Sequence, residues 1–373
     1  MTERTKPPFR ADQVGSLIRP DALIKAREAA EKNELPAAEF RRIQESAIRD
    51  VVRLQEEIGL KVVTDGEFNR KSWQRDFLLK FNNVTLGQAA MRVRFHTAEG
   101  QRDHVPPSLL VSGKLSRPSE IFVDDFRFLK SVAKAMPKVT IPSPTVMHFR
   151  GGRGAIDAKA YPDISVFYDD LARVYREEIA DLAKAGCRYL QIDEVNLAYL
   201  CDPVLRKEVA NFGEDPETLP KTYAKLLNDT IAGKPADMTV CMHLCRGNFA
   251  GAWVAEGGYE PVAELLFNEI DVDGYFLEYD SPRAGGFEPL RFLPKGKVAV
   301  LGLVTTKSPK LESKDELKRR IDEAARFVPL EQLALSPQCG FSSGIGGNAV
   351  TYEDEIKKLR LVVETAREVW GNA

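Results

Sequence analysis

The feature that most constrains the fold is a regular alternation of short apolar runs with longer amphipathic stretches along most of the 373 residues. The short runs are rich in β-branched residues, and several are apolar on both faces, as in strands of a covered parallel sheet. We predict strands over residues 11–17, 61–67, 138–145, 188–194, 238–245, 274–280, 297–304 and 332–339.

The longer stretches have the spacing of surface helices. In residues 37–59, Phe40, Ile43 and Ala47 begin an apolar face that repeats every three or four residues. Similar stretches cover residues 164–185, 217–232, 258–269, 314–326 and 352–370. Strands that alternate with helices form βα units around a parallel sheet. Eight such strands predict an α/β fold, a (β/α)8 barrel of the TIM type, with a doubly wound open sheet as the alternative.

One segment, about residues 81–120, interrupts this rhythm. Residues 91–97 and 108–115 show two-residue alternation of polar and apolar side chains, which indicates strands. We interpret the segment as a β-hairpin-like excursion inserted after the second strand, where it could cover part of the barrel mouth. Since no linker-like stretch divides the chain, we expect residues 1–373 to form a single elaborated barrel domain.

Composition excludes several classes of protein. Hydrophobic residues make up 43% and charged residues 29%, which is ordinary for a soluble globular chain and argues against disorder. The 53 basic and 55 acidic residues give a net charge of −2, so no overall basic field attracts nucleic acid or anionic lipid. The chain shows no signal peptide and no transmembrane run, so we expect a cytoplasmic protein with small-molecule partners. The sequence leaves its oligomeric state open.

Cysteine and histidine are sparse. The five cysteines are odd in number and few for this length, which argues against a disulfide framework and leaves thiols for packing, catalysis or metal binding. Among only four histidines, His243 lies two residues before Cys245, within a predicted strand.

Polar side chains gather where the predicted strands end. In a barrel these positions face a common mouth, and burying such groups is costly unless they bind something. The residues at these ends are Ser16, Asp65, Glu67, Asp193, Glu194, His243, Cys245, Glu278, Lys307 and Cys339.

Four of these residues are candidate metal ligands. His243 and Cys245 point to the same side of a strand, because side chains alternate between its faces. Together with Glu278 and Cys339 they would offer one imidazole, two thiolates and one carboxylate, a set that suits tetrahedral zinc better than Mg²⁺ or Ca²⁺. The alternative is that these cysteines are small buried hydrophobes. Cys241 lies deeper on the same strand.

The other cysteines and the other histidines have simpler interpretations. We expect Cys187 and Cys201 to be packing residues. His148 either touches substrate or makes a loop hydrogen bond, and His96 and His104 are expected to be exposed in the excursion.

The carboxylates and the last glycine-rich stretch leave alternatives open. Asp65, Glu67, Asp193 and Glu194 are candidate acid–base or ammonium-binding groups, or else form salt bridges with nearby arginine. The glycine-rich residues 340–347 form either a flexible mouth loop or an anion site built from backbone N–H groups.

Several motifs together carry a family resemblance. They are Val-Gly-Ser at 14–16, Asp-Gly-Glu at 65–67, Ile-Asp-Glu at 192–194, His-Leu-Cys at 243–245, the Glu278 of Phe-Leu-Glu-Tyr and Ser-Pro-Gln-Cys-Gly at 336–340. In this order and at strand ends, they resemble the catalytic barrel of cobalamin-independent methionine synthase, over about residues 11–345.

The resemblance implies a TIM-type barrel that binds zinc through His243, Cys245, Glu278 and Cys339. It further implies that Glu67 and Asp193 hold the amino group of homocysteine and that Ser16 lies near its carboxylate, with Glu194 adjacent. The implied reaction transfers a methyl group to the zinc-bound thiolate of homocysteine and gives methionine. Zinc would ionise the thiol, which is a poor nucleophile when protonated. We hypothesise that Glu278, the hardest ligand, gives up its place to the substrate sulfur.

Two features depart from the long members of the family. Those enzymes carry an additional N-terminal barrel, whereas this chain has the pattern of the catalytic barrel alone. They also have a His-Ser-Pro motif after the seventh strand, where this sequence has Lys307-Ser308-Pro309. Because lysine is a different acid, with an unperturbed pKa near 10.4, the methyl donor is either a methylated folate or another methyl carrier.

Other functions remain to be distinguished. One is alkyl transfer to another thiol, as in the related epoxide–coenzyme M transferases, although a sulfonate would favour Arg or Lys over Glu67 and Asp193. A zinc-free enzyme of the same barrel superfamily, like uroporphyrinogen decarboxylase, is a second alternative. The third is a binding or regulatory barrel with a structural zinc, which would stabilise the fold without catalysis.

Overall fold

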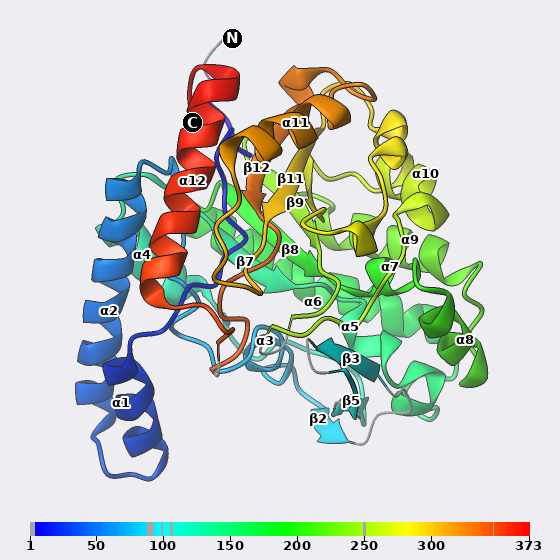
Figure 1. Cartoon of the computed structure of the whole chain (residues 1–373). Helices are drawn as coiled ribbons and strands as arrows, with labels where there is room; N and C mark the ends of the chain where they lie inside the picture. Colours follow the sequence, from blue (N-terminus) through cyan, green and yellow to red (C-terminus); the bar gives the residue numbers. More distant parts are fainter. Residues whose placement is uncertain (1–3, 88–92, 98–99, 105–106, 249–250, 346) are drawn as a thin grey trace.

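A six-stranded parallel sheet forms the centre of the protein, for which the computed structural model describes residues 4–87, 93–97, 100–104, 107–248, 251–345 and 347–373 (Figure 1). Every neighbouring pair in this sheet is parallel. Its strands, in spatial order, are β12 (Leu333–Pro337), β11 (Val298–Val304), β10 (Gly274–Glu278), β9 (Thr239–Leu244), β8 (Tyr189–Glu194) and β7 (Val139–Pro142). Each of the six strands lies within a range that we predicted as a strand. Because the strands are parallel, their carboxyl ends meet at the same edge of the sheet.

Shorter backbone contacts extend both edges of this sheet. Beside β7, β6 (Met136–Pro137) pairs in parallel with β1 (Val62–Val63). At the other edge, Ala11 forms a parallel bridge with Leu335 of β12. The segments predicted as strands over 11–17 and 61–67 are thus mostly irregular.

Side chains take the place of a strand ladder in these two segments. The amide of Gln55 bonds both backbone groups of Thr64, accepting from its N–H at 3.0 Å and donating to its carbonyl at 2.9 Å. The Thr64 hydroxyl donates to the carbonyl of Gly15 at 2.6 Å. These backbone groups are satisfied without regular pairing, and no alternation of apolar residues could have shown this.

Helices surround the sheet, and the predicted ones lie close to their expected positions. They are α2 (Ala37–Ile58), α6 (Ile164–Ala185), α9 (Leu219–Ile231), α10 (Glu260–Glu269), α11 (Lys314–Ala324) and α12 (Tyr352–Trp370). The structure adds α1 (Asp21–Glu31), α3 (Arg75–Leu78), α4 (Val123–Val132), α5 (Val146–Phe149), α7 (Asn196–Tyr199) and α8 (Pro203–Asn211). None of the described helices is long and apolar enough to cross a membrane.

Helix ends follow local chemistry. The Asp163 carboxylate accepts from the backbone N–H of Ser165 and caps α6, which ends at Gly186 in the left-handed conformation with φ 99°. The apolar face of α6 includes Phe167, Leu171 and Leu182, which are fully buried. Burial of such a face, more than helix propensity, stabilises a helix of this length.

The segment 84–111 forms small antiparallel pairs below the sheet in the view of Figure 1. Strand β2 (Val84–Gly87) pairs with β5 (Ser108–Val111), and β3 (Val93–Thr97) pairs with β4 (Gly100–His104). The two segments that we predicted as partners therefore pair with other strands. Alternation identifies a strand but not its partner.

Candidate metal centre and active site

Four side chains meet at the carboxyl ends of the central strands. His243 is on β9 and Cys245 follows it, Glu278 ends β10, and Cys339 lies two residues after β12. One ligand atom from each of these buried residues lies within 4.8 Å of the others. The two sulfur atoms are 3.7 Å apart. The structure thus brings together the four residues that the sequence offered as metal ligands.

The donors fit a zinc ion. His243 is 2% exposed, and both of its ring nitrogens are without a hydrogen-bond partner among the described residues. A buried imidazole without partners is costly, and a metal ligated by one nitrogen would remove part of that cost. Two thiols, one imidazole and one carboxylate match the soft and borderline donors that zinc binds.

Charges within the cluster are strongly coupled. The hydrogen bond between the thiols, together with burial, raises the pKa of Cys245, while the same bond lowers the pKa of Cys339. Burial opposes ionisation of Glu278, but the positive charges of Lys307 and Arg283 hold its pKa below the ordinary value. The pKa values of Cys339 and Glu278 are thus shifted in the direction that ligation of a cation requires.

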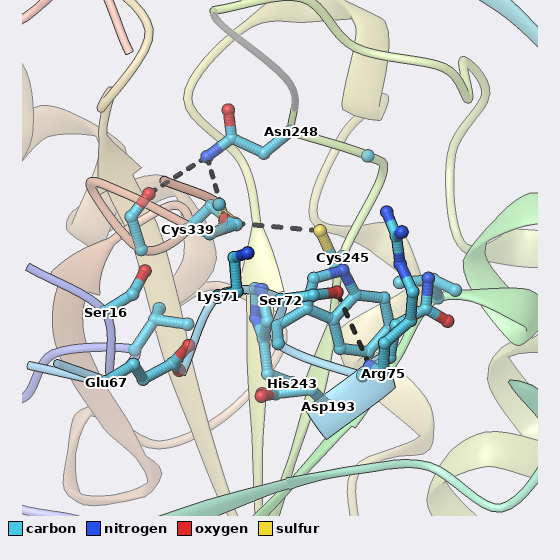
Figure 2. A pocket seen from close by; sticks show the side chains of 18 of the residues that line it. Ser16, Glu67, Lys71, Ser72, Arg75, Asp193, His243, Cys245, Asn248 and Cys339 are labelled. Atoms are coloured by element: carbon cyan, nitrogen blue, oxygen red, sulfur yellow. Dashed lines mark hydrogen bonds between the residues drawn. The ribbon is translucent and has the colours of Figure 1, made fainter. Parts of the chain in front are cut away.

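A cavity of about 300 Å³ opens onto this cluster. Its base includes His243, Cys245 and Cys339, and Figure 2 shows Ser16 and Glu67 to one side of them and Arg75 to the other. Glu278 does not line the cavity. A space of this size suits one small molecule or parts of two.

Glu67 and Asp193 line the cavity as buried carboxylates. One oxygen of Glu67 accepts from the Thr140 hydroxyl at 3.0 Å, while Oε2 has no hydrogen-bond partner among the described residues. Asp193 accepts from the Gln191 amide at 2.7 Å. Burial raises the pKa of Asp193 to about 7 against the opposing charge of His243, and burial also raises the pKa of Glu67 against that of Arg70. A cationic ligand would relieve this cost.

Close packing fixes Ser16 beside the last strand. A Cβ added to Gly340 would lie 2.0 Å from the Ser16 hydroxyl oxygen, so only glycine fits there. The Ser16 hydroxyl accepts from the backbone N–H of Ser342 at 3.3 Å. Gly15, with φ 147°, has no room for a Cβ either, because it would lie 2.7 Å from Thr140. The Val-Gly-Ser motif therefore places the serine against the loop that carries Cys339.

Glu194 lies elsewhere, although the sequence placed it among the substrate-binding candidates. It is fully buried but does not line the cavity. One carboxylate oxygen accepts from the backbone N–H groups of Asn196 and Leu197, and the other accepts from the Thr145 hydroxyl. The hydrogen-bonding capacity of Glu194 is thus used at the start of α7, not for a ligand in the cavity.

Lys307 is near the metal cluster rather than in the lining of the cavity. Its ammonium nitrogen is buried and has no hydrogen-bond partner among the described residues. Its charge acts on Glu278, Cys245 and Asp280.

The cavity also has a wall that the sequence analysis did not identify. It combines aromatic and cationic side chains from loops, from α3 and α7 and from β3, namely Lys71, Trp73, Arg75, Phe95, Arg150 and Tyr199. Of these cations, Lys71 forms an ion pair with Glu31 at 2.6 Å. The run from Lys71 to Arg75 begins four residues after the end of the Asp-Gly-Glu motif, and this nearness is the signal that could have indicated the wall.

The remaining thiols and histidines stay outside the candidate site. Cys241 packs in an apolar cluster with Phe9, Val14 and Tyr189, while Cys187 and Cys201 are also buried. His148 is 1% exposed, and its Nδ1 lies 2.9 Å from the Tyr223 hydroxyl.

Both histidines of the excursion, His96 and His104, were expected to be exposed, and the structure describes the side chain of His96. His96, expected to be exposed, is partly buried and stacks on Trp253, with ring centroids 5.7 Å apart. The side chain of His104 lies outside the described part of the chain, although its backbone pairs with Val93.

Comparisons with known proteins give this site a context. Residues 9–368 match the family described as "Cobalamin-independent synthase, Catalytic domain". "Uncharacterized protein YxjG" of Bacillus subtilis is 44% identical over 370 residues, which cover 99% of this chain and 96% of that protein. The 5-methyltetrahydropteroyltriglutamate–homocysteine methyltransferase of Thermotoga petrophila is 24% identical, and the match covers 97% of this chain but 44% of that longer protein.

Two solved structures are similar over nearly the whole chain. One, from Listeria monocytogenes, is described as a candidate vitamin-B12 independent methionine synthase; it is 36% identical with a TM-score of 0.78, and the match covers 99% of this chain and 100% of that one. The other, from Shewanella, is a B12-independent methionine synthase in complex with selenomethionine. It is 20% identical with a TM-score of 0.69, over 96% of this chain and 97% of that one, and shows the likeness in fold.

Proposed function

This chain belongs to the cobalamin-independent synthase catalytic-domain family, and we propose that it is a zinc-dependent S-methyltransferase that makes methionine from homocysteine. The family is of the methionine synthase type and its members are methyltransferases. The observation that carries the finer proposal is the buried cluster of His243, Cys245, Glu278 and Cys339, of which all but Glu278 line a cavity that also contains two carboxylates. Such a cavity can hold an amino-acid thiol with its sulfur at the cluster.

The ammonium end of the thiol has a natural site. The unpartnered Glu67 Oε2 and the buried Asp193 would bind a cation, and Ser16 lies beside them at the cavity wall. The Shewanella protein, which shares the fold, is described in complex with selenomethionine, and this supports an amino acid as the ligand of this chain. A coenzyme M sulfonate would instead be repelled by two carboxylates, which makes an epoxide–coenzyme M transferase the second candidate rather than the first.

In the proposed mechanism, zinc supplies a charge that keeps the substrate thiol ionised at neutral pH. Glu67 and Asp193 hold the ammonium group and thereby orient the sulfur toward the donor. The new S–C bond forms as the bond between the methyl group and its carrier breaks, and the electron pair of that bond stays with the carrier. The carrier then takes up a proton, which balances the one that the thiol released when it ionised. We assign the cationic Lys307 to stabilising the negative charge that develops on the carrier before this proton arrives.

The methyl donor would face the aromatic and cationic wall. Trp73 and Phe95 offer flat surfaces, and Arg75 and Arg150 offer positive charge. A flat, anionic carrier such as a methylated folate fits this chemistry. We keep another methyl carrier as the alternative, because lysine stands where the long enzymes have histidine.

We propose, further, that the sheet closes into an eight-stranded barrel within one domain over residues 1–373. The bridge from Ala11 to β12, the pairing of β1 with β6 and the hydrogen bond from the Leu17 N–H to the Gly66 carbonyl at 3.0 Å support closure. In this arrangement the excursion would cover the mouth, where Phe95 already lines the cavity. Five cysteines without disulfides are consistent with the predicted cytoplasmic location.

A thiol and donor panel with zinc-loaded protein tests the function. We expect methionine from homocysteine and a methylated folate or another methyl carrier, and no alkylation of coenzyme M. Cys339→Ser should lower the turnover number at least about a hundredfold and weaken zinc binding, because it removes a proposed ligand. Cys187→Ser, which changes a buried thiol outside the cluster, is the matched control.

The alternatives predict different results in the same panel. Alkylation of coenzyme M alone would favour the epoxide–coenzyme M type of transferase. Protein that purifies without bound zinc and alkylates no thiol would favour a zinc-free barrel enzyme such as uroporphyrinogen decarboxylase, and stoichiometric, tightly bound zinc would exclude it. If no thiol were alkylated while Cys339→Ser unfolded the protein, a structural zinc would be the better interpretation.

A further inference from the structure

The Glu278 carboxylate is held by two groups that are not candidate metal ligands. The backbone N–H of Arg246 donates to Oε1 at 2.8 Å, and the Arg283 guanidinium donates to Oε2 at 3.0 Å. The side chains of Glu278 and Arg283 are 0% and 8% exposed, so this ion pair is shielded from water. Each carboxylate oxygen has a further lone pair, so these bonds leave room for a metal.

The ion pair between Glu278 and Arg283 matters at the proposed site because that site carries a net negative charge. Two thiolates and one carboxylate around a doubly charged zinc carry a net charge of about −1, and a substrate thiolate would add another negative charge to a buried space. Arg283 is the cation that contacts Glu278 directly, and Lys307 lies nearby. A carboxylate that leaves the metal beside these cations stays paired.

Arg283 has anchors of its own. Its guanidinium donates to Asp280 at 2.8 Å and to the Ser281 hydroxyl at 2.8 Å, and it lies over the Trp253 ring at 5.3 Å from the centroid. Trp253 in turn forms backbone hydrogen bonds with His96 of β3. These contacts do not involve Glu278, so they can hold the guanidinium in place while the carboxylate moves.

We propose that Arg283 is a positioning residue that retains the Glu278 carboxylate when Glu278 gives up its place on the metal to the substrate thiol. This inference rests on the proposed function. Without Arg283, the carboxylate has one fewer partner off the metal, so it competes more strongly with the incoming thiol. The guanidinium thus favours thiol binding without touching the thiol.

Cobalt-substituted protein provides the test, because thiolate-to-cobalt absorption reports ligand exchange without turnover. In the wild type, homocysteine should increase this absorption as a third sulfur joins the metal. In Arg283→Gln, the homocysteine concentration for half of the change should rise about tenfold, which is about 1.4 kcal/mol. The affinity for cobalt should stay equal or increase, since a nearby positive charge is gone. Arg283→Lys should recover most of the response.

Arg291→Gln is the matched control. Arg291 lies in the same connection between β10 and β11 as Arg283, but it forms an ion pair with Glu260 at the protein surface. A homocysteine response in Arg283→Gln equal to that of the wild type would overturn the inference. So would a loss of cobalt affinity in Arg283→Gln, since it would mean that the guanidinium only holds Glu278 on the metal. If the wild-type cobalt protein responds to no thiol, the proposed function itself is contradicted.

Discussion

The buried carboxylates of this protein differ in how many of their oxygen atoms already accept hydrogen bonds from the fold. Glu67 has one oxygen without a hydrogen-bond partner in the described part of the chain, whereas both oxygens of Glu194 accept hydrogen bonds within the fold. Glu355 near the start of α12 is fully buried and accepts one hydrogen bond, from the Ile18 N–H at 2.8 Å. The same side chain can therefore serve binding, capping or packing, according to its remaining hydrogen-bond capacity.

Glu355 should make stability depend on pH. Burial raises its pKa to about 8, against the opposing effect of the Ile18 N–H. The folded protein therefore holds a proton that the unfolded chain releases near its ordinary pKa of about 4.3. This contribution is fully present below that value and is lost as pH rises toward 8, by an amount on the order of 5 kcal/mol.

The substitution Glu355→Gln removes this titration and keeps a neutral side chain with an acceptor for Ile18. We expect similar unfolding free energies for variant and wild type near pH 5, and a more stable variant at pH 9. Denaturant unfolding at both pH values measures the difference, with the exposed Glu353→Gln on the same helix as control. Parallel pH profiles of the wild type and Glu355→Gln would show that Glu355 titrates normally.

At the scale of elements, the short helix α7 depends on Glu194, which lies two residues before its first residue. The Glu194 carboxylate bonds the N–H groups of Asn196 and Leu197, and this satisfies donors that a helix start leaves open. The neighbouring Asp193 faces the cavity instead. Two adjacent acids thus belong to different parts of the molecule, since strand side chains alternate.

Because Glu194 serves the fold and Asp193 faces the cavity, we expect substitutions of Glu194 to change stability and a substitution of Asp193 to change ligand affinity. Glu194→Ala should destabilise the fold by about 3 kcal/mol because buried donors lose a charged acceptor, while Glu194→Gln keeps an acceptor and retains most of the stability. The affinity for homocysteine should remain near wild type in Glu194→Gln. Asp193→Asn should instead weaken it about tenfold or more with little loss of stability. Calorimetric titration and thermal unfolding separate these effects, and equal affinity losses in both variants would contradict the division.

The sequence predicts elements best where burial alone decides them. The helices α6 and α12 begin and end at the predicted residues, because a long apolar stripe leaves one register against the sheet. Residues 11–17 do not form the predicted regular strand. The Gly15 carbonyl accepts from the Thr64 hydroxyl, and the Gln55 amide binds Thr64, so residues that are distant in sequence supply the hydrogen bonds there. In the excursion, the strands near 93–97 and 108–111 were recognised but their partners were not, since pairing depends on the intervening turns.

Over the whole molecule, the four candidate metal ligands come from strands that lie far apart in the sequence. His243 and Cys245 belong to β9 and its loop, Glu278 to β10, and Cys339 to the loop after β12. The sequence indicated all four, because motifs at strand ends of a parallel sheet converge. It could not give the wall with Arg150 and Phe95, which depends on how the loops and strand β3 fold over the cavity.

Removing the metal should therefore affect the whole fold. A ligand present at a hundred times its dissociation constant stabilises the folded state by about 2.7 kcal/mol. A strong chelator should lower the Tm by several degrees, and zinc should restore it. In Cys339→Ser the chelator should change the Tm much less. Calorimetric scans check this, and an equal Tm with and without chelator would argue against a metal that links these strands.

The distance between Cys245 and Cys339 has a chemical consequence beyond ligation. Sulfur atoms 3.7 Å apart need to approach by less than about 2 Å to reach the length of a disulfide bond. An ion between them would occupy the electron pairs that oxidants attack. Once the ion is removed, air or peroxide could join the two sulfurs and block its return, so metal-free protein has to be kept under a reductant.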